Sequence, residues 1–215
     1  MELTEKQKEL FNRFDELVDL MVDNGFELSY SFDKPECLSN NPQFTIEGDK
    51  LINCENASGD INIPCGVREI AEGVFEGMNI TSVKLTNVEV IGDGAFRNCA
   101  CLQEIKFSER LKIIGDGAFE GCCRVYLADL SQTAVDVLPD AVFRGCTRLT
   151  FVHFPQQLRE IGNNAFENCD ALSKVNITNL SAWCKIVFDC IEKQSNSVST
   201  YLATNPLYYA DLYID

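Results

Sequence analysis

The sequence lacks any run of eighteen apolar residues, the minimum from which a membrane-spanning helix could be built. The first 25 residues also lack a basic stretch followed by an uninterrupted apolar one, so they do not look like a secretory signal. We therefore expect no insertion into a membrane and no signal-directed export.

Basic residues are scarce as well. Lysine and arginine number 18 against 33 aspartates and glutamates, which gives a formal net charge of −15. A chain with this balance is repelled by DNA, RNA and anionic lipid, so we expect no nucleic-acid partner. If charge steers its encounters, the partner is basic. The simpler alternative is that the acidity keeps an elongated protein soluble.

A short motif recurs along the chain: an alanine or valine followed by phenylalanine, with a cysteine three residues later in the last four of five copies. Successive phenylalanines lie 21, 23, 24 and 23 residues apart. The residues concerned are Phe75, Phe96, Phe119, Phe143, Phe166, Cys99, Cys122, Cys146 and Cys169. Apolar positions recur at fixed offsets after each cysteine. A period of about 23 residues lies in the range of leucine-rich repeats.

The period predicts how each unit folds. One unit can form a short strand, a turn, a second short strand and a single helical turn, but it cannot cover its own apolar face. Stacked units share one core, and equivalent residues then lie about 4.8 Å apart. We therefore predict that the five phenylalanines form a single internal spine.

Three segments carry a family resemblance: IGDGAFRNCACLQEIKF, IGDGAFEGCCRVYLADL and IGNNAFENCDALSKVNI resemble BspA-type leucine-rich repeats, also called the Treponema pallidum type. NITNLSAWCKIVF and NPLYYADLYID resemble an insertion between blocks of such repeats. The resemblance covers residues 44–215 and implies an α/β repeat solenoid, a right-handed array with short strands and single helical turns. Bacterial members are commonly surface adhesins that bind host matrix proteins or other microbes, which implies a binding role.

The chain divides into three predicted regions. Residues 1–43 read as an N-terminal capping helix and linker, because Thr4 and Gln7 have capping-box spacing before an amphipathic stretch. Residues 44–179 hold about five repeats and open with the strands FTIEG, KLINCE and INIPCGVREI. Residues 180–215 form a C-terminal insertion or cap, in which Ser181 caps a short helix, AWCKIVFDC, and a final strand leaves a free edge. Free edges pair readily, so a homodimer through this strand is an expectation.

The third repeat is irregular, being one residue longer than its neighbours, with a turn at Ser131, Gln132 and Thr133. We expect a local bulge there.

The four repeat cysteines are predicted to be buried, reduced thiols that donate to the backbone of a neighbouring coil, because free cysteine is small, apolar and a weak donor. Eleven cysteines in reduced form imply a reducing cytosol or an anaerobic habitat. Paired zinc ligands need a spacing that Cys99, Cys101, Cys122 and Cys123 do not offer, so we expect no metal and no cofactor.

The outward columns of the first strands gather Tyr126, Leu127, Phe151 and His153 near the middle of the sheet. Large apolar residues on a solvent face, ringed by polar ones such as Asp129 and Lys106, are typical of a binding surface. The alternatives are that the C-terminal insertion covers these residues, or that they have no role.

His153 is the single histidine, and stacking places it between Asp129 and Asn176. The carboxylate of Asp129 would favour the charged imidazole. A catalytic triad also needs a nucleophile, and no serine or cysteine falls in the adjacent outward places, so we expect no enzyme.

The sequence therefore predicts a noncatalytic protein-binding module, adhesin-like or a scaffold, with an unidentified protein partner. Two alternatives stay open: an acidic inhibitor or decoy of a basic nucleic-acid-binding protein, and a structural segment of a larger surface protein. The cysteines and the missing signal indicate the cytoplasm, whereas the family resemblance indicates the surface of an anaerobic microbe.

Overall fold

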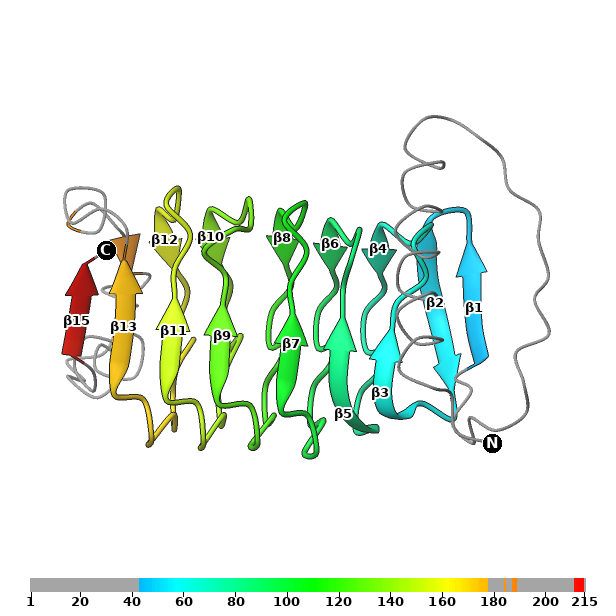
Figure 1. The fold of residues 1–215 in the computed structure, drawn as a ribbon, viewed down its shortest axis with the longest axis horizontal. Coiled ribbons are helices and arrows are strands. Elements are labelled where there is room, and N and C mark those ends of the chain that lie inside the picture. Colours follow the sequence, from blue (N-terminus) through cyan, green and yellow to red (C-terminus); the bar gives the residue numbers. More distant parts are fainter. Residues whose placement is uncertain (1–42, 178–183, 185–186, 189–210, 215) are drawn as a thin grey trace, which may run out of the picture.

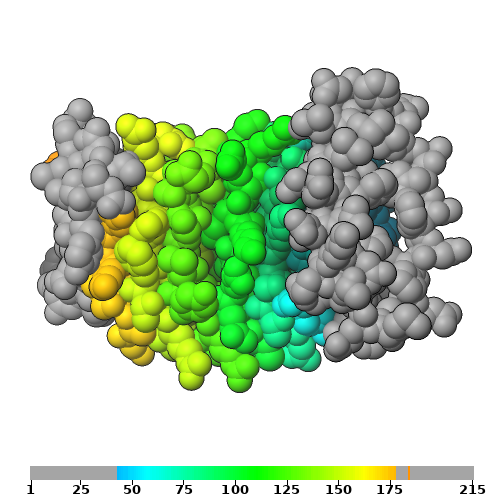
Figure 2. Space-filling model, in the orientation of Figure 1, coloured from blue at the N-terminus to red at the C-terminus, as the bar shows by residue number. Residues whose placement is uncertain are grey.

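The computed structural model describes residues 43–177, 184, 187–188 and 211–214, and the chain winds through successive coils stacked in single file (Figure 1). Each coil contributes one strand to a first face and one shorter strand to a second face. The space-filling view shows the same coils as side-by-side bands that follow the sequence from one end to the other (Figure 2). The expected solenoid is confirmed.

The first face consists of parallel strands that begin new coils. They are β3 (Ser58–Asn62), β5 (Asn79–Lys84), β7 (Glu104–Lys106), β9 (Leu127–Asp129), β11 (Phe151–His153), β13 (Lys174–Ile177) and β15 (Asp211–Ile214). The middle residue of β7, β9 and β11 is buried and its two neighbours are at least partly exposed, because side chains alternate along a strand. The alternation matches the predicted outward columns, except that Asn176 is buried.

The second face consists of two-residue strands in each coil, preceded by a hairpin. Its strands are β1 (Gln43–Glu47), β2 (Lys50–Glu55), β4 (Glu69–Ile70), β6 (Val90–Ile91), β8 (Ile113–Ile114), β10 (Val137–Leu138), β12 (Glu160–Ile161) and β14 (Val187–Phe188). β1 pairs antiparallel with β2 and forms the edge of this face, while the later strands pair parallel. The predicted strands FTIEG and KLINCE correspond to β1 and β2.

The core is a column of stacked aromatic rings. The five repeat phenylalanines are fully buried, and their ring centroids lie 4.9, 5.2, 5.6 and 5.7 Å apart from one coil to the next. No coil could bury its own ring, so each depends on its neighbours for the burial of a phenylalanine side chain, worth about 1.5–3 kcal/mol.

We call the segments that carry these phenylalanines, between each second-face strand and the next first-face strand, the turn face. A helical turn was predicted there, and that prediction is wrong: the described residues contain no helix. Hydrogen bonds instead span three residues, as from the Arg97 N–H to the Gly94 carbonyl at 2.9 Å. Gly94 and Asn98 both have a φ of 56°, and residues in this left-handed region reverse the chain instead of continuing a right-handed helix.

Hydrogen bonds between coils run in opposite directions on two faces. On the turn face an earlier coil donates to a later one, as from the Phe96 N–H to the Ala118 carbonyl at 2.8 Å. After β4, β6, β8 and β12 a later coil donates to an earlier one, as from the Gly92 N–H to the Ile70 carbonyl, also at 2.8 Å. Both sets hold the coils at a fixed spacing.

Glycine occupies one position of this ladder because the coils touch there. A Cβ on Gly92 would lie 2.7 Å from the backbone nitrogen of Glu72, and one on Gly162 would lie 2.7 Å from that of Asp140. The equivalent residue of the irregular coil is Pro139, which has both a ring and no N–H to donate.

Both faces are interrupted at the coil that contains Pro139. Within the described ranges β7 is paired only with β5, and β9 only with β11; β8 and β10 are likewise unpaired with each other. Figure 1 shows the wider spacing between these strands. A local bulge was predicted in this repeat, and the structure shows an interrupted ladder instead. On the second face Pro139 cannot make the bond that Gly115 makes to Ile91 at 2.8 Å, and the Ala134 N–H still donates to the Leu111 carbonyl across the boundary at 2.8 Å. We call β1–β8 the N-terminal block and β9–β15 the C-terminal block.

The two ends of the chain were predicted to carry caps. The N-terminal helix over residues 4–24 lies outside the described residues, as does most of the C-terminal insertion. Val187 and Phe188, predicted to be helical, instead form β14, which pairs parallel with β12. The final strand is confirmed as β15, which pairs parallel with β13 and so continues the first face.

Candidate functional site

The first face of the C-terminal block brings the predicted aromatic residues together. Parallel pairing of β9 with β11 sets Leu127 beside Phe151 and Asp129 beside His153. Tyr126 directly precedes β9 and is 51% exposed, whereas Leu127 and Phe151 are partly buried. We call Tyr126, Leu127, Phe151 and His153 the aromatic patch.

The backbone under the patch is fixed by hydrogen bonds between adjacent coils. Both the N–H and the hydroxyl of Thr150 donate to the Tyr126 carbonyl, at 3.0 and 2.9 Å. One coil further on, the Ser173 N–H donates to the Thr150 carbonyl at 3.1 Å. The patch is therefore carried by ordered strands, which reduces the conformational entropy that a partner must overcome on binding.

The imidazole of His153 is held on three sides. Its ring meets that of Phe151 edge to face, with centroids 4.4 Å apart at 82°. Its Nδ1 lies 3.5 Å from an Asp129 carboxylate oxygen, and its Nε2 lies 3.3 Å from the Asn176 amide nitrogen. With the amide donating to Nε2, the proton of a neutral ring sits on Nδ1 and faces Asp129. These contacts orient the ring.

Asp129 also accepts two hydrogen bonds from Ser131. Its Oγ donates to the Asp129 carboxylate at 2.7 Å, and its N–H donates to the same oxygen at 3.1 Å. This is a local turn that caps Asp129, and it does not form the serine-to-histidine bond that a nucleophile and base require.

Lys106 was predicted to belong to the site, and the structure places it on β7, across the interruption from the patch. Its ammonium lies 3.5 Å from the carboxylate of Glu104 on the same strand. Because β7 and β9 are not paired, Lys106 lies on a different sheet from the strands that carry the patch.

Two basic residues at the rim were not part of the predicted site. Arg124 and Arg148 are exposed and lie two residues before Tyr126 and Thr150. Both arginines lie just before the strands, outside the outward strand positions that predicted the site. Their common offset of two residues after Cys122 and Cys146 is the signal that would have found them.

The repeat cysteines link neighbouring coils through hydrogen bonds. Each repeat cysteine donates its thiol proton to the phenylalanine carbonyl of the preceding coil: Cys99 to Phe75, Cys122 to Phe96, Cys146 to Phe119 and Cys169 to Phe143, at 3.0–3.3 Å. Burial raises the pKa of Cys99 and of Cys169 to about 12. The thiolate is the reactive form of cysteine, so these thiols are inert at neutral pH. The described cysteines form no disulfide.

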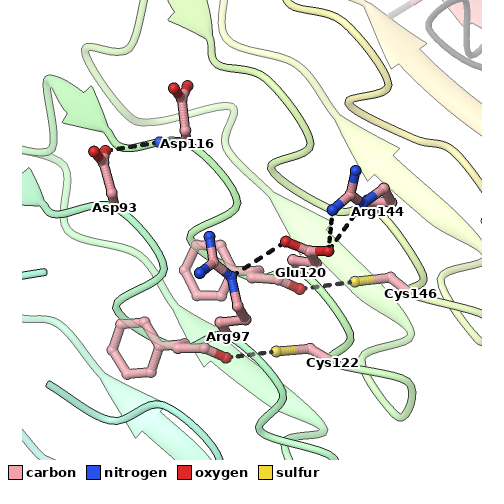
Figure 3. A network of polar contacts seen from close by, with 9 residues as sticks. Asp93, Arg97, Asp116, Glu120, Cys122, Arg144 and Cys146 are labelled. Atoms are coloured by element: carbon pink, nitrogen blue, oxygen red, sulfur yellow. Dashed lines mark hydrogen bonds and ion pairs between the residues drawn. The ribbon is translucent and has the colours of Figure 1, made fainter. Parts of the chain in front are cut away.

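Many acidic groups on the turn face are engaged within the protein (Figure 3). The Asp93 carboxylate accepts from the Asp116 N–H at 2.9 Å, and the Asp116 carboxylate accepts from the Asp140 N–H at 3.1 Å. Glu120 lies between Arg97 and Arg144 and pairs with both. These carboxylates cap backbone groups or neutralise arginines, so part of the acidity has a structural use.

Among the described residues, no group of three or more His, Cys, Asp or Glu side chains is arranged to hold a metal ion. No helix there is both long and apolar enough to cross a bilayer.

Comparison with known proteins identifies the repeats. The profile of the BspA type leucine rich repeat region matches residues 26–136 and 68–198 as six copies, one more than the five counted from the phenylalanines. No curated protein matches the sequence.

Solved structures share the fold. A leucine rich cell surface protein from Faecalibacterium prausnitzii is 31% identical, with a TM-score of 0.62 over 69% of this chain and 41% of that one. The Treponema pallidum leucine rich repeat protein is 26% identical, with a TM-score of 0.55 over 66% of this chain and 71% of that one. A pneumococcal vaccine antigen shares the fold at 20% identity and a TM-score of 0.54.

The chain thus spans less than half of the Faecalibacterium protein. Nothing in these comparisons points to an enzyme family. The match to the family profile extends over most of the sequence. The stacked phenylalanine rings and the thiol-to-carbonyl bonds of the repeat cysteines explain why the motif of this sequence recurs in every coil. The chain belongs to the BspA-type leucine-rich repeat family.

Proposed function

We propose that this chain is a noncatalytic protein-binding module, adhesin-like or a scaffold, that contacts its partner through the aromatic patch. The observation that carries the proposal is Tyr126, a residue that is 51% exposed beside the partly buried Leu127 and Phe151. Tyrosine provides a large contact area for few rotatable bonds, and it is enriched at the centre of protein interfaces.

Polar side chains surround the patch, as an interface rim requires. Asp129 and Lys174 are exposed on the flanking strands, and Thr150 and Gln103 are exposed in the same column as Tyr126. Full desolvation of the centre on binding, with a hydrated rim, is the arrangement in which a few aromatic anchors supply most of the affinity.

The Faecalibacterium relative is described as a cell surface protein. That description supports an adhesin-like role here, in which the patch binds a protein presented by another surface. The match covers only 41% of the Faecalibacterium chain, which also supports a structural role for this chain within a longer array of repeats.

Sedimentation velocity tests the related prediction of a homodimer through β15, which requires a mass twice that of the chain.

A photocrosslinking amino acid tests the patch directly. It replaces Tyr126 in one variant and Ile113 in another, because Ile113 is an equally large exposed side chain, 57% exposed, on the second face. Both proteins are exposed to candidate partners from the natural environment of the cell. We expect covalent capture of a defined protein at position 126 and none at position 113.

The double variant Tyr126→Ser and Phe151→Ser provides the second measurement. We expect it to bind the captured protein at least tenfold more weakly, a loss of about 1.4 kcal/mol or more. Unchanged binding by a double variant with a native circular dichroism spectrum, or equal capture at both crosslinking positions, would contradict the proposal.

A further inference from the structure

Arg124 and Arg148 form a pair of like charges beside the aromatic patch. The hydrogen bonds from the Thr147 hydroxyl to the Cys123 carbonyl, at 3.5 Å, and from the Thr150 hydroxyl to the Tyr126 carbonyl stack one segment directly on the other. The two arginines are therefore about 4.8 Å apart at the backbone, the spacing of paired strands. Both are exposed, and neither makes an ion pair within the described part of the chain.

Two other basic columns of this protein are built differently, although Lys84 and Lys106 are also paired with each other across β5 and β7. On the turn face Glu120 separates Arg97 from Arg144, and on the second face Glu89 pairs with both Arg68 and Lys112. Each of these columns alternates in sign, so that neighbouring like charges are neutralised by the acid between them. The Arg124 and Arg148 column has no such acid, although the chain as a whole carries a net charge of −15.

We infer that Arg124 and Arg148 together bind a carboxylate of the partner, and that the partner segment is an acidic peptide whose neighbouring apolar side chain contacts the aromatic patch. The inference rests on the proposed function, because it assigns the partner's chemistry at that same site. Two guanidinium groups side by side present several donors to one or two carboxylates, which is the geometry that favours arginine for this role.

The spacing sets the form of the peptide. Arg124 and Tyr126 are exposed while Val125 between them is buried, so both side chains leave the chain on the same side. Two residues of extended chain span about 7 Å. An extended segment with glutamate or aspartate two residues before phenylalanine or leucine therefore reaches the arginine pair and the patch together.

The net charge of the chain argues against a polyanion, such as a nucleic acid, as the partner. A nucleic acid presents a phosphate at every nucleotide, and a protein with a net charge of −15 repels such a chain as a whole. One or two carboxylates flanked by neutral residues meet the local positive charge without that repulsion.

Two synthetic peptides test the inference on the full chain. One has the sequence Ser-Glu-Glu-Ser-Phe-Leu-Ser with blocked ends, and the other replaces both glutamates by glutamine. Binding is followed by amide chemical shifts of the isotope-labelled protein. We expect shifts at residues 124–127 and 148–151, and we expect the glutamate peptide to bind about tenfold more tightly than the glutamine peptide.

Substitutions locate the effect. In the variant Arg124→Ser and Arg148→Ser the two peptides should bind equally. The control Lys84→Ser and Lys112→Ser removes the same charge from other positions, and it should keep the tenfold difference. Both pairs are exposed, so circular dichroism is expected to be unchanged.

Several results overturn the inference. They are equal binding of both peptides by the unmodified chain, a preference for glutamate that survives loss of the two arginines, the absence of any shift at millimolar peptide, and binding of inorganic phosphate as tight as that of the glutamate peptide. If the peptides bind equally but Tyr126→Ser with Phe151→Ser abolishes both, the inference fails while the proposed function stands. If that variant also binds normally, both fail.

Discussion

The N-terminal and C-terminal blocks follow one repeat pattern, yet their strands do not join. Within the N-terminal block the Gly92 and Gly115 N–H groups donate to the preceding coil, both at 2.8 Å, and β4, β6 and β8 form one continuous face. At the boundary Pro139 takes the glycine position, and pairing stops on both faces. On the second face, one residue in the closest-packed column thus removes the hydrogen bond that joins neighbouring coils elsewhere.

The turn face crosses the boundary without a break. The Phe119 N–H donates to the Val142 carbonyl at 3.0 Å and the Gly121 N–H to the Arg144 carbonyl at 2.7 Å, distances close to those between intact coils. Phe119 and Phe143 stack at 5.6 Å, and Cys146 donates to the Phe119 carbonyl. The comparison shows that the aromatic spine and the turn bonds hold the coils together, while the strands are dispensable at one junction.

The largest loss of stability is expected from Phe119→Ala, because the Phe119 ring packs against Phe143 across the boundary between the two blocks. Phe119→Ala leaves a cavity in the spine at the junction that strands no longer bridge, and removal of a buried phenylalanine costs about 3–5 kcal/mol. We expect urea unfolding to divide into two transitions, one for each block.

The matched variant is Phe96→Ala, which removes an equally buried ring between coils joined by strands on both faces. It should lower the free energy of unfolding by a similar amount while the transition stays single. Two transitions in Phe96→Ala, or one in Phe119→Ala, would show that the strands do not matter to the coupling of the blocks.

Gly115→Pro copies the boundary into the N-terminal block. The ring would overlap the backbone of Asp93, and the Ile91 carbonyl would lose its donor, at a cost of about 1–3 kcal/mol for the buried acceptor alone. We expect a lower midpoint of thermal unfolding and faster amide exchange in β6 and β8. Exchange rates like those of the unmodified protein would mean that proline is not the cause of the interruption.

Pro139→Gly is the reverse change and should have a smaller effect. It restores an N–H that can donate to the Ile114 carbonyl, a gain of about 1 kcal/mol that the added freedom of glycine partly offsets. The measurement is hydrogen exchange of the new amide and of β10. Protection comparable to that of Gly115 would show that the two blocks have joined on the second face, and rapid exchange would contradict this.

Ala141 is a second departure of the boundary coil from the pattern. Its φ is 53°, where the equivalent residues include Gly94 and Gly117. A left-handed conformation costs a residue with a Cβ about 1–2 kcal/mol, so Ala141→Gly should stabilise the protein by up to about 1 kcal/mol. Chemical denaturation measures this gain, and Ala118→Gly, at a buried alanine without positive φ, should instead destabilise.

The smallest effect is expected from removing the charge of Asp116, which lies between Asp93 and Asp140 in successive coils. Burial, and the neighbouring carboxylates of Asp140 and Asp93, raise the pKa of Asp116 above its ordinary value. The folded state therefore holds the proton more tightly than the unfolded state, and the stability from this group is lost as the pH rises through the raised pKa. Asp116→Asn keeps the acceptor for the Asp140 N–H, as Asn163 occupies the same place in a later coil.

We expect Asp116→Asn to be slightly more stable than the unmodified protein at pH 7 and equal to it near pH 3, below the ordinary pKa of an aspartate. Thermal unfolding across this range provides the measurement. A gain that is largest at low pH would reverse the sign and contradict the account.

The periodic phenylalanines and cysteines were sufficient to predict the solenoid, the spine and the inward and outward columns. These features follow from spacing alone, because every coil must place chemically equal residues in the same environment. The helical turns were predicted wrongly because the same spacing fits a helical turn and a series of reverse turns. The positive φ of Asn98, Asn164 and Asn168 identifies the reverse turns, and the presence of asparagine in the sequence is not enough to predict a positive φ.

The interruption could have been predicted from Pro139, since proline cannot donate within a ladder. The longer turn at Ser131 drew attention to the same repeat but suggested a bulge. At the candidate site, the register that unites Leu127 with Phe151 followed from the column alignment. The arginine pair could not be predicted from the column alignment. It stands out because no acidic side chain lies between the two arginines, and the sequence does not show where the acidic side chains of each coil point.

The opposed hydrogen bonds of the turn and second faces have an electrostatic consequence. In an α-helix the peptide dipoles add, and the ends acquire partial charges that side chains or ligands must balance. Here the Phe96 N–H points toward the next coil while the Gly92 N–H points toward the previous one, so the two columns of dipoles oppose each other along the axis. These two columns therefore offset each other, and the ends of the array do not acquire from them the partial charges found at the ends of a helix.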